Sequence, residues 1–470
     1  MSKDELLALI RNGQDLTRRQ RFALVMSLSL PAMLSQLSTI VEEYVDASMV
    51  GSMGAEASAA IGLVSTSIWL LGGVSHSAST GFYVQVAHRI GANDMRGARD
   101  VFRQGIVSCL LFCLALVAIG VCISPWLPGW LGGEEAIQRD ATLYFAVFCL
   151  SMPLHQFCSL AGGVLRCSGD VKTPALLQVM CCVLNVCFNY LMIFQYGLGV
   201  LGAAIGTCLA ELVTSSAMMW YACVKCPAMN LLQDIPVGKH LFSKESGRFR
   251  PTRITLLKSL NIAGPMGIEH AIMCGAQIMS TIIVAPLGTI AIAANSFGII
   301  IEGLCYMPGY GIADAATTLV GQSLGAQRKP LARQFAYITV GSGIAIMSLM
   351  AVVMYLGASW VMQFMTPDLM VQQLTAEVLR IEAWAEPGFA AAIVCYGVFV
   401  GAGDTKIPCT MNLASIWAVR ITLAALMAGT MGLKGVWIAM AIELCFRGVI
   451  FLWRLFGNSW MNRYEKIINN

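Results

Sequence analysis

Carboxylates inside long apolar stretches are the residues of this sequence best suited to chemistry. Asp46 stands near the end of an apolar stretch at residues 22–50, with Glu42 and Glu43 one helical turn before it, and Glu269 interrupts a later stretch. A charge inside a membrane span is costly, so each of these acids is a functional candidate. Carboxylates this close cannot all ionise cheaply at low dielectric. The chemistry available to them is reversible binding of a proton or a cation.

Transmembrane helices are the elements that must position these acids. The 470 residues are 57% hydrophobic and 12% charged, with a mean hydropathy of +0.70, unlike a soluble domain. A span needs about 20 mostly apolar residues, and these runs lack the alternation of barrel strands. We therefore expect an all-α polytopic membrane protein with twelve spans, near residues 22–50, 57–85, 101–126, 142–165, 173–196, 200–224, 256–286, 290–318, 335–360, 373–400, 407–428 and 433–455.

The basic residues predict the orientation of the spans. If the spans simply alternate, 26 of the 30 Lys and Arg residues fall at loops and ends on one side, and only Arg139, Arg380, Arg420 and Lys434 fall elsewhere. By the positive-inside rule that side is cytoplasmic, which places both termini inside. The net charge of +4 is then a topology signal and gives no reason to expect a nucleic-acid partner.

An internal duplication runs through the chain. Residues recur at a constant offset of 234, including Pro31 with Pro265, Gly54 with Gly288, and the segment 169–174 with 403–408. Each copy holds an even number of spans, so both enter the membrane in the same direction. We expect two six-helix bundles, related by a pseudo-two-fold axis along the membrane normal, with the substrate site between them. The corresponding ranges are a cytoplasmic segment 1–21, a first bundle 22–224, a cytoplasmic linker 225–255, a second bundle 256–455 and a cytoplasmic tail 456–470.

The repeated loop signatures resemble those of the multidrug and toxic compound extrusion (MATE) transporters. They read VDASMVG at 45–51, GA at 91–92, LRCSGD at 165–170, LVGQSLGA at 319–326 and GAGDTK at 401–406. The likeness covers nearly the whole chain apart from the two tails and the linker. It implies an antiporter that exports amphipathic, often cationic organic compounds in exchange for H⁺ or Na⁺.

The resemblance also implies an ion-coupling site in the first bundle. Pro31 and Asp46 match a bending proline and an acid on the first span, and Asn185, Asn189 and Thr207 match polar residues on the fifth and sixth spans. Asn185 and Asn189 are one turn apart and share a helix face. The family pattern has Asp where this chain has Asn189, which should weaken a Na⁺ site at Asp46 and leave Asp46 as the main titrating group. The coupling ion stays open, and the amides could instead be interhelical glue.

The duplication sharpens this hypothesis. The offset maps Asp46 to Ser280, Asn185 to Val419 and Asn189 to Leu423, so this polar cluster exists only in the first half. We expect the two halves to have divided their labour, with the first as the ion sensor.

Other polar residues support a substrate cavity less directly. We expect Glu43, Glu269, Met273 and Gln277 to line it, because the resemblance places an acid on the seventh span and the 27 methionines suit a cavity that adapts to varied shapes. His76 and His155 fit interior hydrogen-bonded histidines better than proton relays. Arg420 could neutralise an intramembrane acid, whereas Arg380 and Glu382 should snorkel at an outer end.

Several function classes are disfavoured. The sequence has neither a Walker Gly-Lys-Ser/Thr element nor a His-Glu-x-x-His motif, so neither ATP drive nor zinc hydrolysis is indicated. We expect no enzyme and no cofactor, with H⁺ or Na⁺ as coupling ion and a small organic molecule as substrate. A flippase or exporter of a lipid-linked or saccharide intermediate is the nearest alternative, and a membrane-embedded lipid enzyme is a remote one. The expected setting is the plasma membrane of a prokaryote, the inner membrane if Gram-negative, with a monomer as the working unit.

Overall fold

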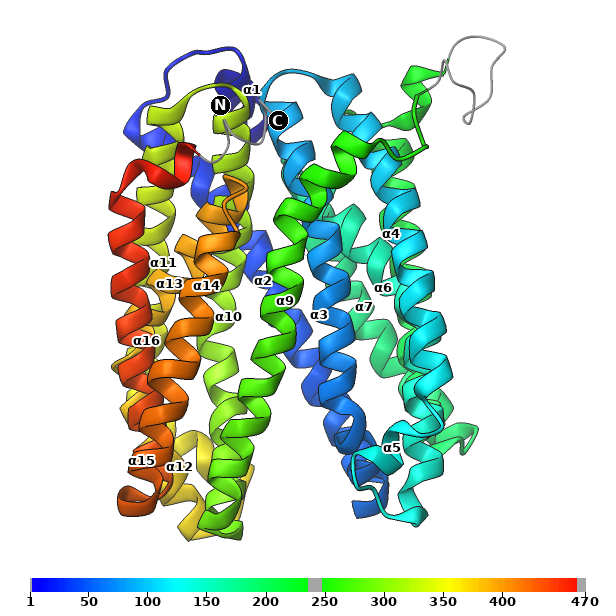
Figure 1. The fold of residues 1–470 in the computed structure, drawn as a ribbon, viewed down its shortest axis with the longest axis vertical. Helices are drawn as coiled ribbons and strands as arrows, with labels where there is room; N and C mark the ends of the chain where they lie inside the picture. Colours follow the sequence, from blue (N-terminus) through cyan, green and yellow to red (C-terminus); the bar gives the residue numbers. More distant parts are fainter. Residues whose placement is uncertain (1, 236–246, 463–470) are drawn as a thin grey trace. The chain divides into compact units, whose positions relative to one another are not determined.

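The protein is helical wherever its structure is described. The computed structural model describes residues 2–235 and 247–462, so parts of the predicted linker 225–255 and tail 456–470 lie outside the described residues. Long apolar runs form long helices because a helix satisfies every backbone polar group internally. The elements, drawn in Figure 1, are α1 (Lys3–Arg11), α2 (Arg18–Gly51), α3 (Ala55–Gly91), α4 (Met95–Ile123), α5 (Leu127–Trp130), α6 (Glu135–Ser168), α7 (Lys172–Tyr190), η1 (Leu191–Gln195), α8 (Gly199–Trp220), η2 (Tyr221–Lys225), η3 (Leu231–Asp234), α9 (Arg253–Val284), η4 (Ala285–Leu287), α10 (Thr289–Gly325), α11 (Lys329–Met365), α12 (Leu369–Ala383), α13 (Glu386–Gly401), α14 (Lys406–Ala414), η5 (Ser415–Ile421), α15 (Thr422–Met431), α16 (Leu433–Phe456) and η6 (Asn458–Trp460).

The number of spans agrees with the prediction except for one break. Among the described residues, 11 helices are long and apolar enough to cross a membrane, and one bent pair brings the total to 12. The bent pair is α12 and α13, which meet at 58° where a single helix was expected at 373–400. Pro387 follows the break in the first turn of α13, where proline removes no intrahelical hydrogen bond. The all-helical, multi-span membrane fold is confirmed.

Contacts divide the chain into two compact units. These units differ from the two halves of the sequence because two helices, α2 and α9, are each shared between both units. The N unit holds residues 38–270 together with 10–13, and the C unit holds residues 271–470 together with 1–9 and 14–37. α2 therefore contributes its beginning to the C unit and its end to the N unit, and α9 does the reverse. In both helices the change of unit comes shortly after an internal proline, Pro31 or Pro265. The bundle ranges 22–224 and 256–455 remain predictions.

Equivalent helices pack in equivalent pairs within each unit. In the N unit α6 contacts α3, α4 and α8, while α3 contacts α4 and α7 contacts α8. In the C unit the counterparts repeat this pattern, because α13 contacts α10, α11 and α16, while α10 contacts α11 and α15 contacts α16. The duplication seen in the loop signatures thus extends to the packing.

Candidate ion-binding site

Asp46 lies in α2 and is bound by two amides from α7. Nδ2 of Asn189 donates to Oδ1 of Asp46 at 2.7 Å, and Nδ2 of Asn185 donates to Oδ2 at 3.4 Å. The Asn185 amide also donates to Oγ1 of Thr207 in α8 at 3.1 Å. Asn185 and Asn189 are buried, whereas Asp46 is half-buried. The structure brings together the four residues predicted for ion coupling, and their role in binding an ion stays a prediction.

Local helix geometry explains how this cluster forms. The one-turn spacing on α7 lets Nδ2 of Asn189 donate to Oδ1 of Asn185 at 2.8 Å. A methyl group added at Gly206 of α8 would lie 2.0 Å from Oδ1 of Asn189 and 2.8 Å from its backbone nitrogen. Only glycine lets the two helices approach this closely, as small residues do at helix interfaces in membranes. Gly206 therefore holds Thr207 within reach of Asn185.

The arrangement suits a proton switch. Both oxygens of Asp46 accept amide N–H groups, as an ionised carboxylate does, since it can only accept. Protonation would turn one of these acceptors into a donor and break one of the two bonds to α7. Gain or loss of a proton at Asp46 would therefore change the hydrogen bonds between α2 and α7.

Glu42 and Glu43 occupy different surroundings although they are neighbours. Oε2 of Glu42 accepts from Nε2 of Gln178 at 3.4 Å, and its Oε1 accepts from Sγ of Cys181 at 3.9 Å. Glu43 lies on an exposed face of α2. The structure thus connects Glu42 to α7, one turn from the Asp46 cluster, and leaves Glu43 outside these contacts.

The remaining residues predicted for the substrate cavity divide between the two units. Glu269 is buried in the N unit. Met273 packs beside Ala276 and Ile416 in the C unit, where Gln277 is exposed. Their shared role in one cavity stays a prediction.

A second buried polar cluster lies in the C unit, where the sequence predicted only that Arg420 could neutralise an intramembrane acid. In α16, Nε and Nη2 of Arg447 donate to the two oxygens of Glu443 at 2.7 Å each. Oγ of Ser415 donates to Oε1 of Glu443 at 2.5 Å, and Nε of Arg420 lies 4.0 Å from its Oε2. Glu443 is thus the acid that faces Arg420. Since Ser415 and Arg420 belong to the π-helical segment η5, this cluster sits at the kind of helix distortion that often marks functional sites.

The snorkelling position expected for Glu382 is wrong. Glu382 and Glu386 are 0% exposed, and none of their four carboxylate oxygens has a hydrogen-bond partner among the described residues. The two acids lie on either side of the break between α12 and α13, and Glu302 of α10 is buried within electrostatic reach of them. Arg380 is partly exposed, and its Nη2 donates to Oγ of Ser359 at 2.7 Å. Each unit therefore carries buried acids, at positions that the duplication does not relate.

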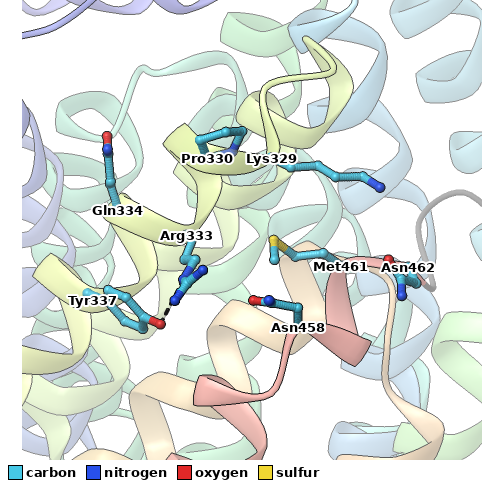
Figure 2. A pocket seen from close by; sticks show the side chains of 8 residues that line it. All are labelled: Lys329, Pro330, Arg333, Gln334, Tyr337, Asn458, Met461 and Asn462. Carbon is cyan, nitrogen blue, oxygen red and sulfur yellow. Dashed lines mark hydrogen bonds between the residues drawn. The ribbon is translucent and has the colours of Figure 1, made fainter.

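A polar pocket lies apart from these acids, at the start of α11 and the end of the described chain. Figure 2 shows its lining, in which Lys329 and Arg333 supply the charges and Tyr337 and Asn458 supply polar groups. Its volume is about 480 Å³. Nε of Arg333 donates to the hydroxyl of Tyr337 at 2.8 Å. None of the intramembrane carboxylates lines this pocket, so it is separate from the candidate ion site.

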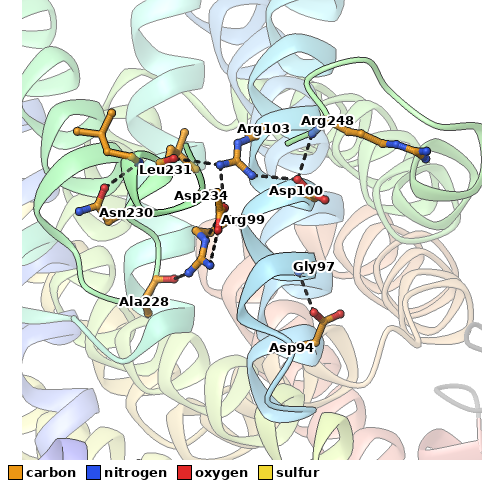
Figure 3. A network of polar contacts seen from close by, with 11 residues as sticks. Asp94, Gly97, Arg99, Asp100, Arg103, Ala228, Asn230, Leu231, Asp234 and Arg248 are labelled. Atoms are coloured by element: carbon orange, nitrogen blue, oxygen red, sulfur yellow. Dashed lines mark hydrogen bonds and ion pairs between the residues drawn. The ribbon is translucent and has the colours of Figure 1, made fainter. Parts of the chain in front are cut away.

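A charged network ties the described start of the linker to α4 (Figure 3). Arg99 donates to both oxygens of Asp234 at 2.7 Å each, and Arg103 donates to Asp234 at 2.8 Å and to Asp100 at 2.9 Å. Burial raises the pKa of Asp234, but hydrogen bonds and charge from Arg99 and Arg103 outweigh it, so the pKa is lowered from its ordinary value. The network fixes η3 to the N unit.

Comparison with known families places these features in context. A family model described as MatE matches residues 31–191 and again residues 265–426. The two matches begin at Pro31 and Pro265, the same pair that begins the duplication.

Individual relatives and solved structures cover almost the whole chain. A probable multidrug resistance protein NorM of Thermotoga maritima is 24% identical over 449 residues, covering 93% of each chain. A protein of the same name from Neisseria meningitidis serogroup A is 25% identical over 453 residues, covering 92% of this chain and 93% of its own. Among solved structures, a MATE protein in complex with MaL6 has a TM-score of 0.86 at 20% identity, covering 99% of each chain. An outward-facing multidrug resistance MATE transporter has a TM-score of 0.84 at 21% identity, covering 95% of this chain and 96% of its own.

Proposed function

The chain belongs to the multidrug and toxic compound extrusion (MATE) family of membrane transporters, and from this premise we propose that it exports amphipathic organic cations in exchange for protons bound at Asp46. The observation that carries the proposal is the pair of amide donors that hold both oxygens of the Asp46 carboxylate. Its relatives are named for multidrug resistance, which supports the class of substrate.

Protonation of Asp46 would act on α2 directly. The end of α2 belongs to the N unit and its beginning to the C unit, with Pro31 ahead of the change. Proline removes an i→i−4 hydrogen bond and lets a helix bend. Loss of one amide contact at Asp46 would change the preferred bend of α2, and with it the balance between two transporter conformations. The coupling requires that the proton bind one conformation more tightly than the other. Similar MATE proteins have been solved in straight and in bent conformations.

A proton fits this site better than Na⁺. The cluster holds one carboxylate, because Asn189 stands where the family pattern has a second acid, and the neutral amide contributes no negative charge to attract a cation. The amides also present N–H donors, not oxygens, to Asp46. A Na⁺ ion would need these amides to turn before it could be coordinated.

Buried charge favours a cationic cargo over a lipid-linked or saccharide intermediate. A large anionic headgroup would require free basic residues deep in the spans. Arg447 is committed to Glu443, and Arg420 lies beside the same acid. Glu302, Glu382 and Glu386 leave the interior of the C unit acidic. This charge distribution favours an organic cation.

The test is uptake of ethidium, a fluorescent organic cation, from the medium into inverted membrane vesicles, whose outer surface is the cytoplasmic face of the membrane. An imposed pH gradient should drive ethidium movement with or without Na⁺, and a Na⁺ gradient alone should not. Asp46→Asn should abolish the pH-driven movement while the protein still inserts in the membrane. Asp140→Asn, which removes an exposed acid from α6, serves as the matched control and should transport normally. Full transport by Asp46→Asn would overturn the assignment.

The bacterial relatives support a setting in the prokaryotic plasma membrane. The one-sided distribution of Lys and Arg supports cytoplasmic termini.

A further inference from the structure

A second acid and a histidine form a pair within the N unit. Nδ1 of His155 in α6 lies 3.2 Å from Oε1 of Glu211 in α8. Both residues belong to helices that qualify as membrane spans. An ionisable pair at this depth is costly unless it faces the bundle interior or water, which makes it a functional candidate. The side chains keep 42% and 17% of their surface exposed, so neither is sealed in packed core.

Acidic residues lie one helical turn away from the Asp46 cluster on two helices, α8 and α2. On α8, Glu211 follows Thr207 by one turn, and on α2, Glu42 precedes Asp46 by one turn. The Glu42 carboxylate is close enough to Glu211 and His155 for their charges to act on it. Glu42 thus stands between the Asp46 cluster and the His155–Glu211 pair.

The α7 helix follows the same steps. Asn185 and Asn189 bind Asp46, and one and two turns earlier Cys181 and Gln178 bind Glu42. The polar residues therefore form two tiers, one around Asp46 and one around Glu42, which lie one helical turn apart along α2, α7 and α8.

A third tier continues from His155. Ser159 lies one turn further along α6, and its Oγ lies 3.0 Å from Nδ1 of His76 in α3. Both α6 and α3 run toward the basic loops predicted to be cytoplasmic. The tiers therefore lead from Asp46 toward that side of the N unit.

The second copy of the duplication lacks equivalents of these polar residues. The offset of 234 maps His155 to Phe389, Glu211 to Cys445 and Glu42 to Ala276. The second copy therefore packs the same helices without an acid or an imidazole at these positions, so packing does not require them.

We propose that the His155–Glu211 pair is a second proton-binding site, which takes up the proton that leaves Asp46 by way of Glu42. The neutral imidazole of His155 accepts the proton and becomes an imidazolium paired with the Glu211 carboxylate. The proton then leaves toward Ser159 and His76, which restores the neutral ring. One proton enters and one leaves, so no other reactant is needed. Imidazole suits this role because it exchanges protons near neutral pH.

Other titratable and charged groups of the N unit act electrostatically on the pair itself, on Glu42 or on His76. They are Glu42, Glu43 and Asp46 of α2, His76 of α3, Cys158 and Arg166 of α6, Cys181 of α7, Cys208 of α8 and His270 of α9. The acids stabilise an imidazolium at His155, and Arg166 opposes a second positive charge further along the path. This balance favours a proton that stays at the pair only briefly.

The inference rests on the proposed proton coupling, and proteoliposomes can test the two separately. Vesicles would contain the pH dye pyranine, with ethidium as the transported cation, and both signals would be followed under an imposed pH gradient. His155→Gln and Glu211→Gln should each slow coupled proton and ethidium movement about tenfold. Both should also change the pH dependence of transport, while ethidium binding to the purified variants stays within about twofold of wild type.

Two further variants separate a proton role from a structural one. Glu211→Asp keeps an acid and should restore most of the rate, and Glu135→Gln, at the exposed start of α6, should behave as wild type. Normal rates with an unchanged pH profile in His155→Gln and Glu211→Gln would overturn the second site while leaving Asp46 coupling intact. Failure of the wild type to respond to a pH gradient would overturn the proposed function itself. Equal loss in Glu211→Gln and Glu211→Asp, with reduced thermal stability in both, would assign the pair a structural role and also overturn the inference.

Discussion

The amide of Asn189 is held between two partners, with its nitrogen 2.7 Å from the Asp46 carboxylate and its oxygen packed against Gly206. This amide joins α2, α7 and α8 at one point. Small changes at Asn189 or Gly206 should therefore alter the coupling of ion binding to transport. The first two predictions follow from this contact.

Asn189→Asp should change the ion that the transporter uses. A second carboxylate beside Asp46 raises the cost of leaving both ionised, which favours a bound cation. We expect Na⁺ to stimulate ethidium transport by the variant about tenfold, while wild type shows no response. Transport in vesicles with an imposed Na⁺ gradient and no pH gradient measures this. A variant that stays insensitive to Na⁺ would show that the charge at position 189 does not select the ion.

Gly206→Ala should displace Asn189. The added methyl would lie 2.0 Å from Oδ1 and 2.8 Å from the backbone nitrogen of Asn189, and a backbone neighbour cannot simply rotate away. Overpacking of this kind costs about 1–3 kcal/mol. We expect a lower thermal unfolding temperature in detergent and a loss of pH-driven transport. Gly72→Ala is the control, because nothing lies within 4 Å of its added methyl. Equal behaviour of the two variants would contradict the tight α7–α8 contact.

Pro31→Ala should restore the missing backbone hydrogen bond of α2 and stiffen it. If α2 must bend during transport, the variant should keep its expression and thermal stability but transport about tenfold more slowly. Pro330→Ala is a suitable control, because Pro330 lies in the first turn of α11, where it breaks no intrahelical bond. Unimpaired transport by Pro31→Ala would remove the hinge from the mechanism.

Asp234→Asn should destabilise the protein in a pH-dependent way. The pKa of Asp234 is lowered in the folded protein, so its contribution to stability is fully present above the unfolded value of about 3.9. That contribution is lost as the pH falls through the lower folded value. At pH 7 the variant should unfold about 2 kcal/mol more easily than wild type, since a carboxylate bound to two guanidiniums is lost.

Thermal unfolding in detergent at a series of pH values would measure this difference, which should shrink as the solution is acidified below the unfolded pKa. Asp15→Asn is the control, because Asp15 is fully exposed in its pair with Arg328 and its removal should leave the stability nearly unchanged. A constant difference between Asp234→Asn and wild type at all pH values would exclude ionisation of Asp234 as its source.

Hydropathy and the duplication predicted most of the fold, since each span is a long apolar run bounded by charged or glycine-rich loops. The break between α12 and α13 was missed because Trp384 and Ala385 do not interrupt the apolar pattern, and a proline two residues later is compatible with a continuous span. Glu382 lies beside that break and is buried. The local apolar pattern therefore led to the wrong prediction that Glu382 lies at an outer end of a span.

The Asp46 cluster could be assembled from the sequence only because the family resemblance supplied contacts between helices. Spacing alone places Asn185 and Asn189 on one face of α7 but does not say which helix they face. His155 shows the same limit, because its partner Glu211 is 56 residues away on another helix. Tertiary contacts of this kind have no signal in the order of residues along the chain.

The sharing of α2 between two units has a consequence for how the protein is made. α2 is synthesised well before α10, yet its early residues Ala32 and Met33 pack against Gly311 of α10. Until α10 is inserted in the membrane, that part of α2 is exposed to lipid without its native contacts. A gene cut at the linker would leave each product missing a segment that the other carries, so the two products should become functional only when made in the same membrane.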